Sequence, residues 1–367
     1  MGLVSWIAND HDIQSMVYID DTFSTELADS ISYYEPYDIS IPTHQVDTLR
    51  LWDHIGLPHE KPKQIWGRSL TVIGFEVDPN AMTFTMPELK RAELLAALRE
   101  FCAVPKGGRR HSLRKYWQLA GWINWSFNVY PLLKPGLSHV YEKTRGKTNP
   151  DAGIFVNRGV IDDLSWFSRH LSNSTGVHLI ESLEWDPSDA DVIAFCDASL
   201  KGLGVYFPEL GLGYQSLPPS VALEFTESPA ATEHEKSGFP IFYLEAFCVY
   251  WCLHQIAFLV RKNGNVRVRK ITIWTDNSNT FDIFNSLHAK PFYNEILKSA
   301  VDILITNDFQ LRVLLLPGKK NIVADALSRC QNDDATEHHP GLLIDSSTPL
   351  PQIPFTPPRE TLGADKI

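Results

Sequence analysis

The chain has 367 residues, of which 44% are hydrophobic and 21% are charged, and its formal net charge is −11. This composition is typical of a globular protein with room for two or three domains, so any disorder must be local. The acidic balance counts against nucleic-acid binding by the surface as a whole, and only local basic clusters could neutralise phosphates.

Cysteine usage and hydropathy indicate the class of protein. The five cysteines are odd in number and lie mostly in apolar segments, which predicts buried thiols, no disulfide framework and an intracellular protein. Residues 241–260 are nearly all apolar, but Glu245 and His254 within them argue against a membrane span. We therefore expect no membrane partner, and the choice between nucleus and cytoplasm stays open.

The first half of the chain predicts two hairpins followed by helices. Residues 13–24 read as an apolar strand, a turn containing Asp20 and Asp21, and a returning strand. Residues 70–78 and 82–87 predict a second hairpin. The apolar spacing then predicts helices over residues 88–101, 111–130 and 157–171.

The second half predicts an α/β arrangement with an acid at the end of several elements. An apolar strand ends on Asp197, and a second strand follows at residues 202–207. Glu245 lies near the start of the apolar helix, and the strand at residues 271–275 runs into Asp276. A last strand, a Pro-Gly turn and a short helix carry Asp325.

Four acids gathered at one point would repel one another unless cations lay between them. A pair of Mg²⁺ (or Mn²⁺) ions, about 3.5 to 4 Å apart, meets that requirement and supplies the chemistry of phosphodiester hydrolysis. A single Asp at a strand end is usually a solvated turn residue, whereas the ordered set of four is far more specific. The loop at residues 217–238 reads as an exposed insertion, and its acids are rivals to Glu245: Glu224, Glu227, Glu233 and Glu235.

These motifs together resemble the ribonuclease H domain of retrotransposon reverse transcriptases. The resemblance is carried by Asp197-Ala-Ser, by Glu245 on a helix, by Thr-Asp276-Asn, and above all by the closing run Pro-Gly-Lys-Lys-Asn-Ile-Val-Ala-Asp325-Ala-Leu-Ser-Arg. It implies a mixed five-stranded sheet with flanking helices, and four acids that hold two metals and cut the RNA strand of an RNA/DNA hybrid. Some ribonucleases H place a His before the last Asp, and residues 314–325 contain none.

A second resemblance concerns the first hairpin. Tyr18-Ile-Asp20-Asp21 is similar to the palm signature of reverse transcriptases, which implies that Asp20 and Asp21 are metal ligands of a polymerase-site remnant. The family's fingers and its third catalytic Asp precede this turn, where nineteen residues cannot contain them. We therefore expect no RNA-directed DNA polymerase activity from this chain alone, unless a separate polypeptide supplies the missing fingers. The helical region also has a fainter likeness to retroelements that encode a tyrosine recombinase.

The resemblances divide the chain into four parts. Residues 1–87 would be a truncated palm, 88–185 a helical thumb or connection, 186–330 the ribonuclease H-like domain, and 331–367 a disordered Pro-rich tail. Contacts to nucleic acid are expected from small polar residues beside the acids and from basic residues: Ser199, Asn277, Lys319, Lys320, Arg109, Arg110, Arg267 and Arg269.

Two other accounts of the chain stay open at this point. One is a catalytically inactive retroelement remnant that at most binds nucleic acid, which the incomplete polymerase half favours and the complete set of four acids opposes. The other is a different enzyme on the same fold, such as a transposase, against which the closing motif and the palm-like hairpin both speak.

Overall fold

The computed structural model describes residues 2–10, 13, 15–19, 21–103, 108–174, 177–179, 185–219, 233–264 and 267–353. The chain forms two compact units, which we describe separately. One consists of Met1–Ala96 with Asn173–Leu183, and the other of Ala97–Ser172 with Glu184–Ile367.

The first unit is built from short strands and one helix packed on a hairpin. Its elements are α1 (Gly2–Asp10), β1 (Met16–Tyr18), β2 (Asp21–Phe23), β3 (Ile31–Tyr34), η1 (Glu35–Tyr37), β4 (Ile39–Pro42), α2 (Thr43–Ile55), η2 (Lys61–Lys63), β5 (Leu70–Val72), β6 (Phe75–Asp78), β7 (Thr83–Thr85) and β10 (Val177–Leu179). The predicted hairpin around the acidic turn is confirmed, because β1 and β2 pair antiparallel with Tyr18 opposite Asp21. The expected strand at residues 70–78 is instead two strands, since Ile73 and Gly74 both take positive φ and turn the chain.

Along the chain, α3 (Glu88–Cys102) contains the boundary between the two units, Ala96 and Ala97, and the second unit continues with helices. These are α4 (Leu113–Ser126), η3 (Pro131–Leu137), α5 (Ser138–Thr144) and α6 (Arg158–Asn173), with the short pair β8 (Arg110–Ser112) and β9 (Gly153–Phe155) at one end. The helix expected over residues 111–130 begins after its cap Ser112, whose hydroxyl accepts a hydrogen bond from the backbone N–H of Lys115, and it ends at Ser126.

A mixed sheet forms the centre of the second unit, and α/β is therefore the fold class of this part of the chain. Among the described residues it has six strands in the order β15-β14-β11-β12-β13-β16. Their bounds are β11 (Val192–Ala198), β12 (Leu203–Phe207), β13 (Leu212–Ser216), β14 (Lys270–Thr275), β15 (Gln310–Leu315) and β16 (Leu343–Asp345). The pairs β11–β12 and β12–β13 are antiparallel, whereas β11–β14, β14–β15 and β13–β16 are parallel.

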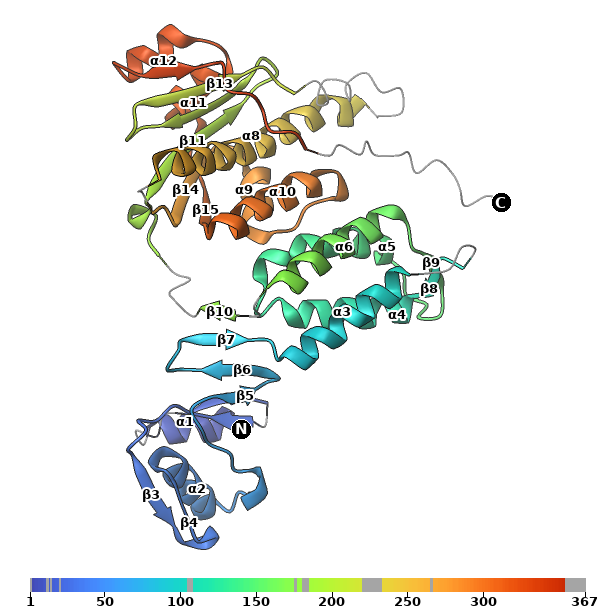
Figure 1. Cartoon of the computed structure of the whole chain (residues 1–367), viewed down its shortest axis with the longest axis vertical. Coiled ribbons are helices and arrows are strands. Elements are labelled where there is room, and N and C mark those ends of the chain that lie inside the picture. The colour runs from blue at the N-terminus through green and yellow to red at the C-terminus, as the bar shows by residue number, and fades with distance from the viewer. Residues whose placement is uncertain are drawn as a thin grey trace. The chain divides into compact units, whose positions relative to one another are not determined.

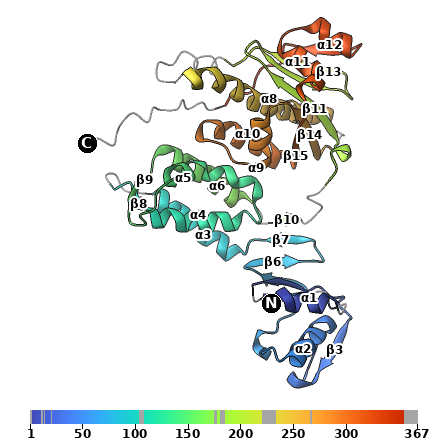
Figure 2. The same cartoon turned by 180° about the vertical axis from the view of Figure 1, so that it is seen from behind.

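Helices cover both faces of this sheet (Figures 1 and 2). On one face lies α8 (Glu233–Asn263), with α9 (Ser278–Ser286) and α10 (Pro291–Asn307) beside it, and they bury the main core with Cys196 and Val205 of the strands. Successive strand residues point to opposite faces, so Gly204 faces the other side. There α11 (Ile322–Ser328) packs so closely that a Cβ at Gly204 would overlap its backbone.

Residues 331–353 differ from the disordered tail that the sequence suggested. They form α12 (Asn332–His338) and β16, and β16 adds a sixth strand where five were expected. The physical reason is local burial: Ala335 and Leu342 are buried against Ala326 and Leu327 of α11, so a few apolar residues anchor an otherwise polar, Pro-rich segment.

A buried polar network joins the helices to the α/β part of the second unit. Asp163 of α6 is fully buried and accepts hydrogen bonds from His139 Nδ1 at 2.8 Å and from Lys298 Nζ of α10 at 2.9 Å. Asn294 Nδ2 donates to the same carboxylate at 3.2 Å. Burial alone would raise the pKa of Asp163, but the bonds from His139 and the charge of Lys298 outweigh it and lower that pKa. The two parts are therefore held together by groups that are costly to separate.

The apolar part of α8 is a helix of the core. Residues Ile241–Asn263 are long and apolar enough to cross a membrane by length and composition alone, which is weak evidence, and 78% of that stretch is buried inside the unit. A helix that packs on both a sheet and a neighbouring helix is apolar on most of its sides, because most of its sides are buried.

Candidate metal centre

The strand register places two acids at one end of the sheet. In the parallel pair of β11 and β14, Phe195 lies opposite Trp274, and two residues further along come Asp197 and Asp276. Parallel strands have their carboxyl ends at the same edge, so both carboxylates lie there. Asp197 is buried within β11, whereas Asp276 is exposed directly after β14.

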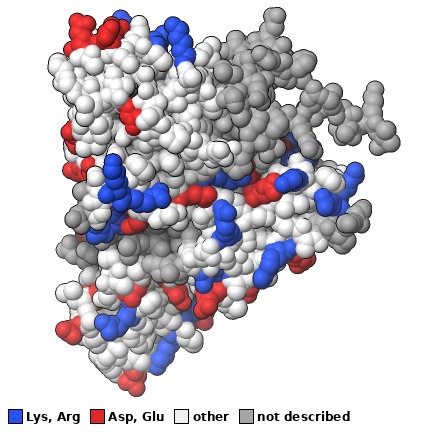
Figure 3. All heavy atoms as spheres, turned by 45° about the horizontal axis from the view of Figure 1, so that its top comes forward, with Lys and Arg blue, Asp and Glu red and all other residues white. Residues whose placement is uncertain are grey.

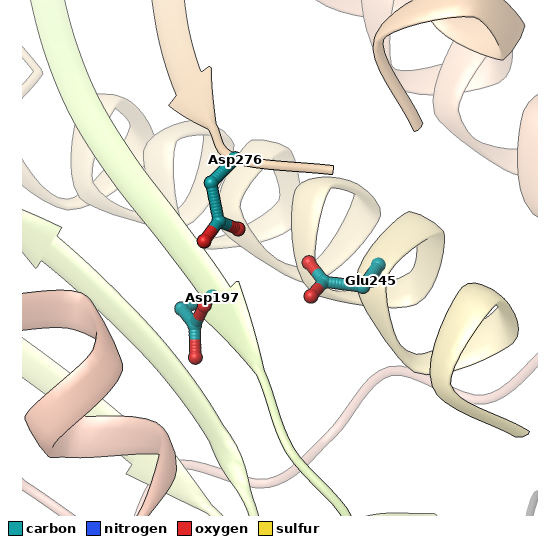
Figure 4. Close-up of side chains that lie close together, drawn as sticks. All are labelled: Asp197, Glu245 and Asp276. Carbon is teal, nitrogen blue, oxygen red and sulfur yellow. The ribbon is translucent and has the colours of Figure 1, made fainter. Parts of the chain in front are cut away.

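Helix α8 supplies the third acid. Glu245 is 5% exposed, and one turn later the Cys248 thiol donates hydrogen bonds to the carbonyl oxygens of Asp197 at 3.3 Å and Gly204 at 3.4 Å. Those bonds fix α8 against the strands. Asp197, Glu245 and Asp276 each offer an oxygen within 4.8 Å of the others, and the three side chains converge on one space (Figure 4).

Burial and mutual repulsion disfavour the charged forms of these acids. Burial, followed by the charges of Asp197 and Asp276, raises the pKa of Glu245 to about 9. Burial is also the largest cause for Asp197, whose pKa is raised to about 7, and for Asp276, whose pKa is raised as well. At pH 7 and without a cation, Glu245 therefore keeps a proton that the same side chain would release in water.

Helix α11 brings Asp325 and two neighbours to the same region. Ser328 is fully buried, and its hydroxyl donates to Asp197 Oδ2 at 2.5 Å. Asp325, one turn earlier, adds to the negative charge felt by Asp197 and Glu245, but it lies outside the group of three. Its Oδ1 instead accepts from Arg329, from Nε at 2.8 Å and from Nη2 at 2.7 Å. The structure thus brings three of the four predicted acids together and pairs the fourth with an arginine.

The Pro-Gly turn before α11 closes over Asp276. A Cβ at Gly318 would lie 2.7 Å from Asp276 Oδ2, so any larger residue there would require the Asp276 carboxylate to move. Lys319 and Lys320 follow Gly318 in η6 (Gly318–Lys320), and both are exposed. Lys320 also lines a shallow pocket with Phe195 and the start of α11.

The two small polar residues predicted to contact nucleic acid already have structural partners. Ser199 donates to the carbonyl of Ser328 at 2.8 Å and accepts from the backbone N–H groups of Lys201 and Gly202. Asn277 caps α9 by accepting from Thr280 N at 3.0 Å. Both side chains hold the backbone that carries the acids, and their contact with a ligand stays a prediction.

Two predicted basic residues lie at the wrong end of the sheet for the metal centre. Arg267 and Arg269 precede β14, whereas Asp276 follows it, and six residues of strand separate Lys270 from Asp276 by roughly 20 Å. Arg269 also pairs with Asp308 at 3.3 Å. They cannot contact the same phosphate as the acids, because the strand carries them away from it.

The remaining basic predictions lie in the helical part of the second unit. Arg109 and Arg110 are exposed at the start of β8, and Arg114 nearby pairs with Asp151 at 3.4 Å. On the face drawn in Figure 3, Lys and Arg side chains are interspersed with Asp and Glu. That pattern gives no broad basic field on this face.

The palm-like hairpin is only partly described. Asp21 is exposed at the start of β2, and Asp20 lies outside the described residues. Within the described part of the chain, no group of three or more metal-ligating side chains includes Asp21.

The structure leaves the four rivals to Glu245 untested. Glu224 and Glu227 lie outside the described residues, and the side chains of Glu233 and Glu235 in α8 are not described either. Glu245 is therefore the described glutamate that lies beside the two aspartates.

The donor set suits a hard divalent cation. All three groups are carboxylates, which Mg²⁺ and Mn²⁺ prefer. Glu245 Oε2 is buried and has no hydrogen-bond partner, so the protein leaves an acceptor that a cation would satisfy. Sequence reasoning had found these acids but not Ser328, Arg329, Cys248 or Gly318, because their roles depend on how α8 and α11 cross the sheet.

Comparison with known proteins adds a distant likeness. Neither a family model nor a curated protein matches the sequence. Among solved structures, the foamy viral protease-reverse transcriptase in complex with dsDNA aligns with 12% sequence identity and a TM-score of 0.34. The alignment covers 86% of this chain and 58% of that one, so the chain spans less than two thirds of its length. The site's own geometry, and not this likeness, supports the function proposed below.

Proposed function

We propose that the second unit is a ribonuclease H-like nuclease of retroelement origin that hydrolyses the RNA strand of RNA/DNA hybrids with two Mg²⁺ or Mn²⁺ ions. The observation that supports it is the meeting of Asp197, Glu245 and Asp276, from a strand, a helix and a second strand end, within 4.8 Å. Gathering three carboxylates is electrostatically costly, and a bound cation would offset that cost.

The four acids would hold the ions between them. Asp197, Glu245 and Asp276 would supply ligands to one ion, and Asp197 and Asp325 would supply ligands to the other. When bound, the ions would activate a water for in-line attack and stabilise the leaving 3′ oxygen. Ser328 orients Asp197 through its 2.5 Å hydrogen bond, and the Gly318 turn holds Asp276 in place.

The substrate would be recognised by charge and by its 2′-hydroxyl. Lys319 and Lys320, which are exposed and directly follow Gly318, would contact the phosphate backbone. The 2′-hydroxyl would distinguish the RNA strand from DNA. The palm-like hairpin with Asp20 and Asp21 would be a polymerase-site remnant that takes no part in this hydrolysis, and the protein would act inside the cell.

The test is cleavage of an end-labelled RNA/DNA hybrid. With Mg²⁺ or Mn²⁺ the protein should cut the RNA strand, and it should leave a DNA duplex of the same sequence intact. Asp276→Asn should abolish cutting without changing the circular dichroism spectrum, whereas Asp282→Asn, an exposed aspartate on α9, should cut like the parent. Full activity of Asp276→Asn would remove Asp276 from the centre. No cutting by the parent would favour an inactive remnant that at most binds nucleic acid.

A further inference from the structure

Asp325, the acid outside the group of three, is paired with the guanidinium of Arg329. Two of the three nitrogens of the Arg329 guanidinium, Nε and Nη2, reach the same oxygen of Asp325, Oδ1, at 2.8 and 2.7 Å. The two residues are one helical turn apart, at the end of α11, where this pairing is geometrically easy. The carboxylate that we propose as a metal ligand, that of Asp325, is therefore already paired with an arginine.

The influence of Arg329 extends to the other acids. Burial and the neighbouring acids raise the pKa of Asp197, and the positive charge of Arg329 opposes that rise. Arg329 acts in the same direction on Asp276. In the metal-free protein Arg329 is thus a counter-ion for three of the four acids, Asp325, Asp197 and Asp276.

We propose that Arg329 is a positioning residue that competes with one of the two cations for Asp325, so that the metal centre fills in two unequal steps. This inference rests on the proposed function. The first cation enters among Asp197, Glu245 and Asp276, which are already assembled. The second must displace the guanidinium from Asp325, because a cation bound there would lie close to a like charge.

The pair is weak enough to be displaced. The Arg329 side chain is 52% exposed and that of Asp325 is 39% exposed, so solvent screens their attraction. A divalent cation carries twice the charge of the guanidinium and needs no ordered side chain. Arg329 therefore lowers the affinity of the second site without closing it.

Binding of Mn²⁺ to the full chain without nucleic acid tests the inference, by counting free Mn²⁺ with electron paramagnetic resonance. The parent should show one tight site and one weaker site. Arg329→Gln removes the competing charge and should tighten the weaker site about tenfold, leaving the tight site nearly unchanged. Arg329→Lys keeps a competing charge and should stay within about twofold of the parent.

Arg158→Gln is the matched control, because Arg158 forms a similar pair with Asp162 four residues away, at 3.4 Å on α6. It should bind Mn²⁺ like the parent. If the parent binds two ions and Arg329→Gln leaves the weaker affinity unchanged or lowers it, the competition is refuted while the proposed nuclease stands. If the parent binds no Mn²⁺, both are refuted. Tightening by Arg329→Gln together with no hybrid cleavage supports the competition and refutes the nuclease alone.

Discussion

Glu245 gives the sharpest test of the electrostatics of the centre. Its carboxylate is buried, its Oε2 has no partner, and its pKa is raised to about 9 from an ordinary 4.5. An acid with a raised pKa in the folded state makes stability fall as pH rises from the unfolded pKa to the folded one. The metal-free protein should therefore lose stability between about pH 4.5 and pH 9, and Glu245→Gln should remove this group's share of the loss.

The size of the effect follows from that pKa. Keeping Glu245 protonated at pH 7 costs about 3 kcal/mol relative to the unfolded chain. A buried glutamine avoids this cost but leaves an amide partly unsatisfied, so we expect a net gain of roughly 2 kcal/mol. For a unit of this size, that gain is a rise of about 4 to 8 °C in Tm.

Thermal unfolding followed by circular dichroism would measure it. In EDTA, Glu245→Gln should melt above the parent at pH 7 and slightly below it near pH 4, where only the cost of the unsatisfied amide remains, while the exposed Glu209→Gln should match the parent at both. Saturating Mn²⁺ should raise the Tm of the parent more than that of Glu245→Gln, because the variant loses a ligand. A parent whose metal-free stability is flat from pH 5 to pH 8, or a variant less stable than the parent in EDTA at pH 7, would refute the reasoning.

Two further predictions concern packing. Asp163→Asn should lower the free energy of unfolding by about 2 to 3 kcal/mol, because it removes one of the two acids paired with the buried Lys298 and leaves only Glu295, at 2.6 Å; chemical denaturation would show this, and a loss below 1 kcal/mol would contradict a buried ion pair. Gly318→Ala should weaken Mn²⁺ binding about tenfold, since its Cβ would displace Asp276 Oδ2. The matched change Gly121→Ala on α4 meets no atom within 4 Å and should leave binding unchanged, so equal affinities for all three proteins would contradict the crowding at Gly318.

The sequence allowed the acids to be found because each ends or interrupts an apolar element. A strand that stops on Asp197 and another that stops on Asp276 have their ends at one edge if they are parallel neighbours, and the structure pairs them so. Glu245 stands out because an apolar helix has few reasons to carry a carboxylate. These signals are local, and local signals survive without knowledge of the tertiary fold.

The contacts of α11 could not be found in this way. The helix has seven residues, too few for a periodic pattern to say which side meets the sheet. Whether Ser328 reaches Asp197, and whether Asp325 faces Arg329 or the other acids, depends on how the helix is rotated. The position of Arg267 and Arg269 was within reach of sequence reasoning, because an extended strand must carry them far from Asp276.

The short strand β16 protects one edge of the sheet in the second unit against aggregation. It is three residues long and pairs with β13, which is five residues long and would otherwise end the sheet with unpaired backbone groups. A long unpaired edge strand can pair with strands of other chains, whereas a very short edge strand offers few backbone groups for such pairing. A protein cut after Cys330 would lose this cover, and its insolubility could then be mistaken for a failure of the nuclease domain to fold.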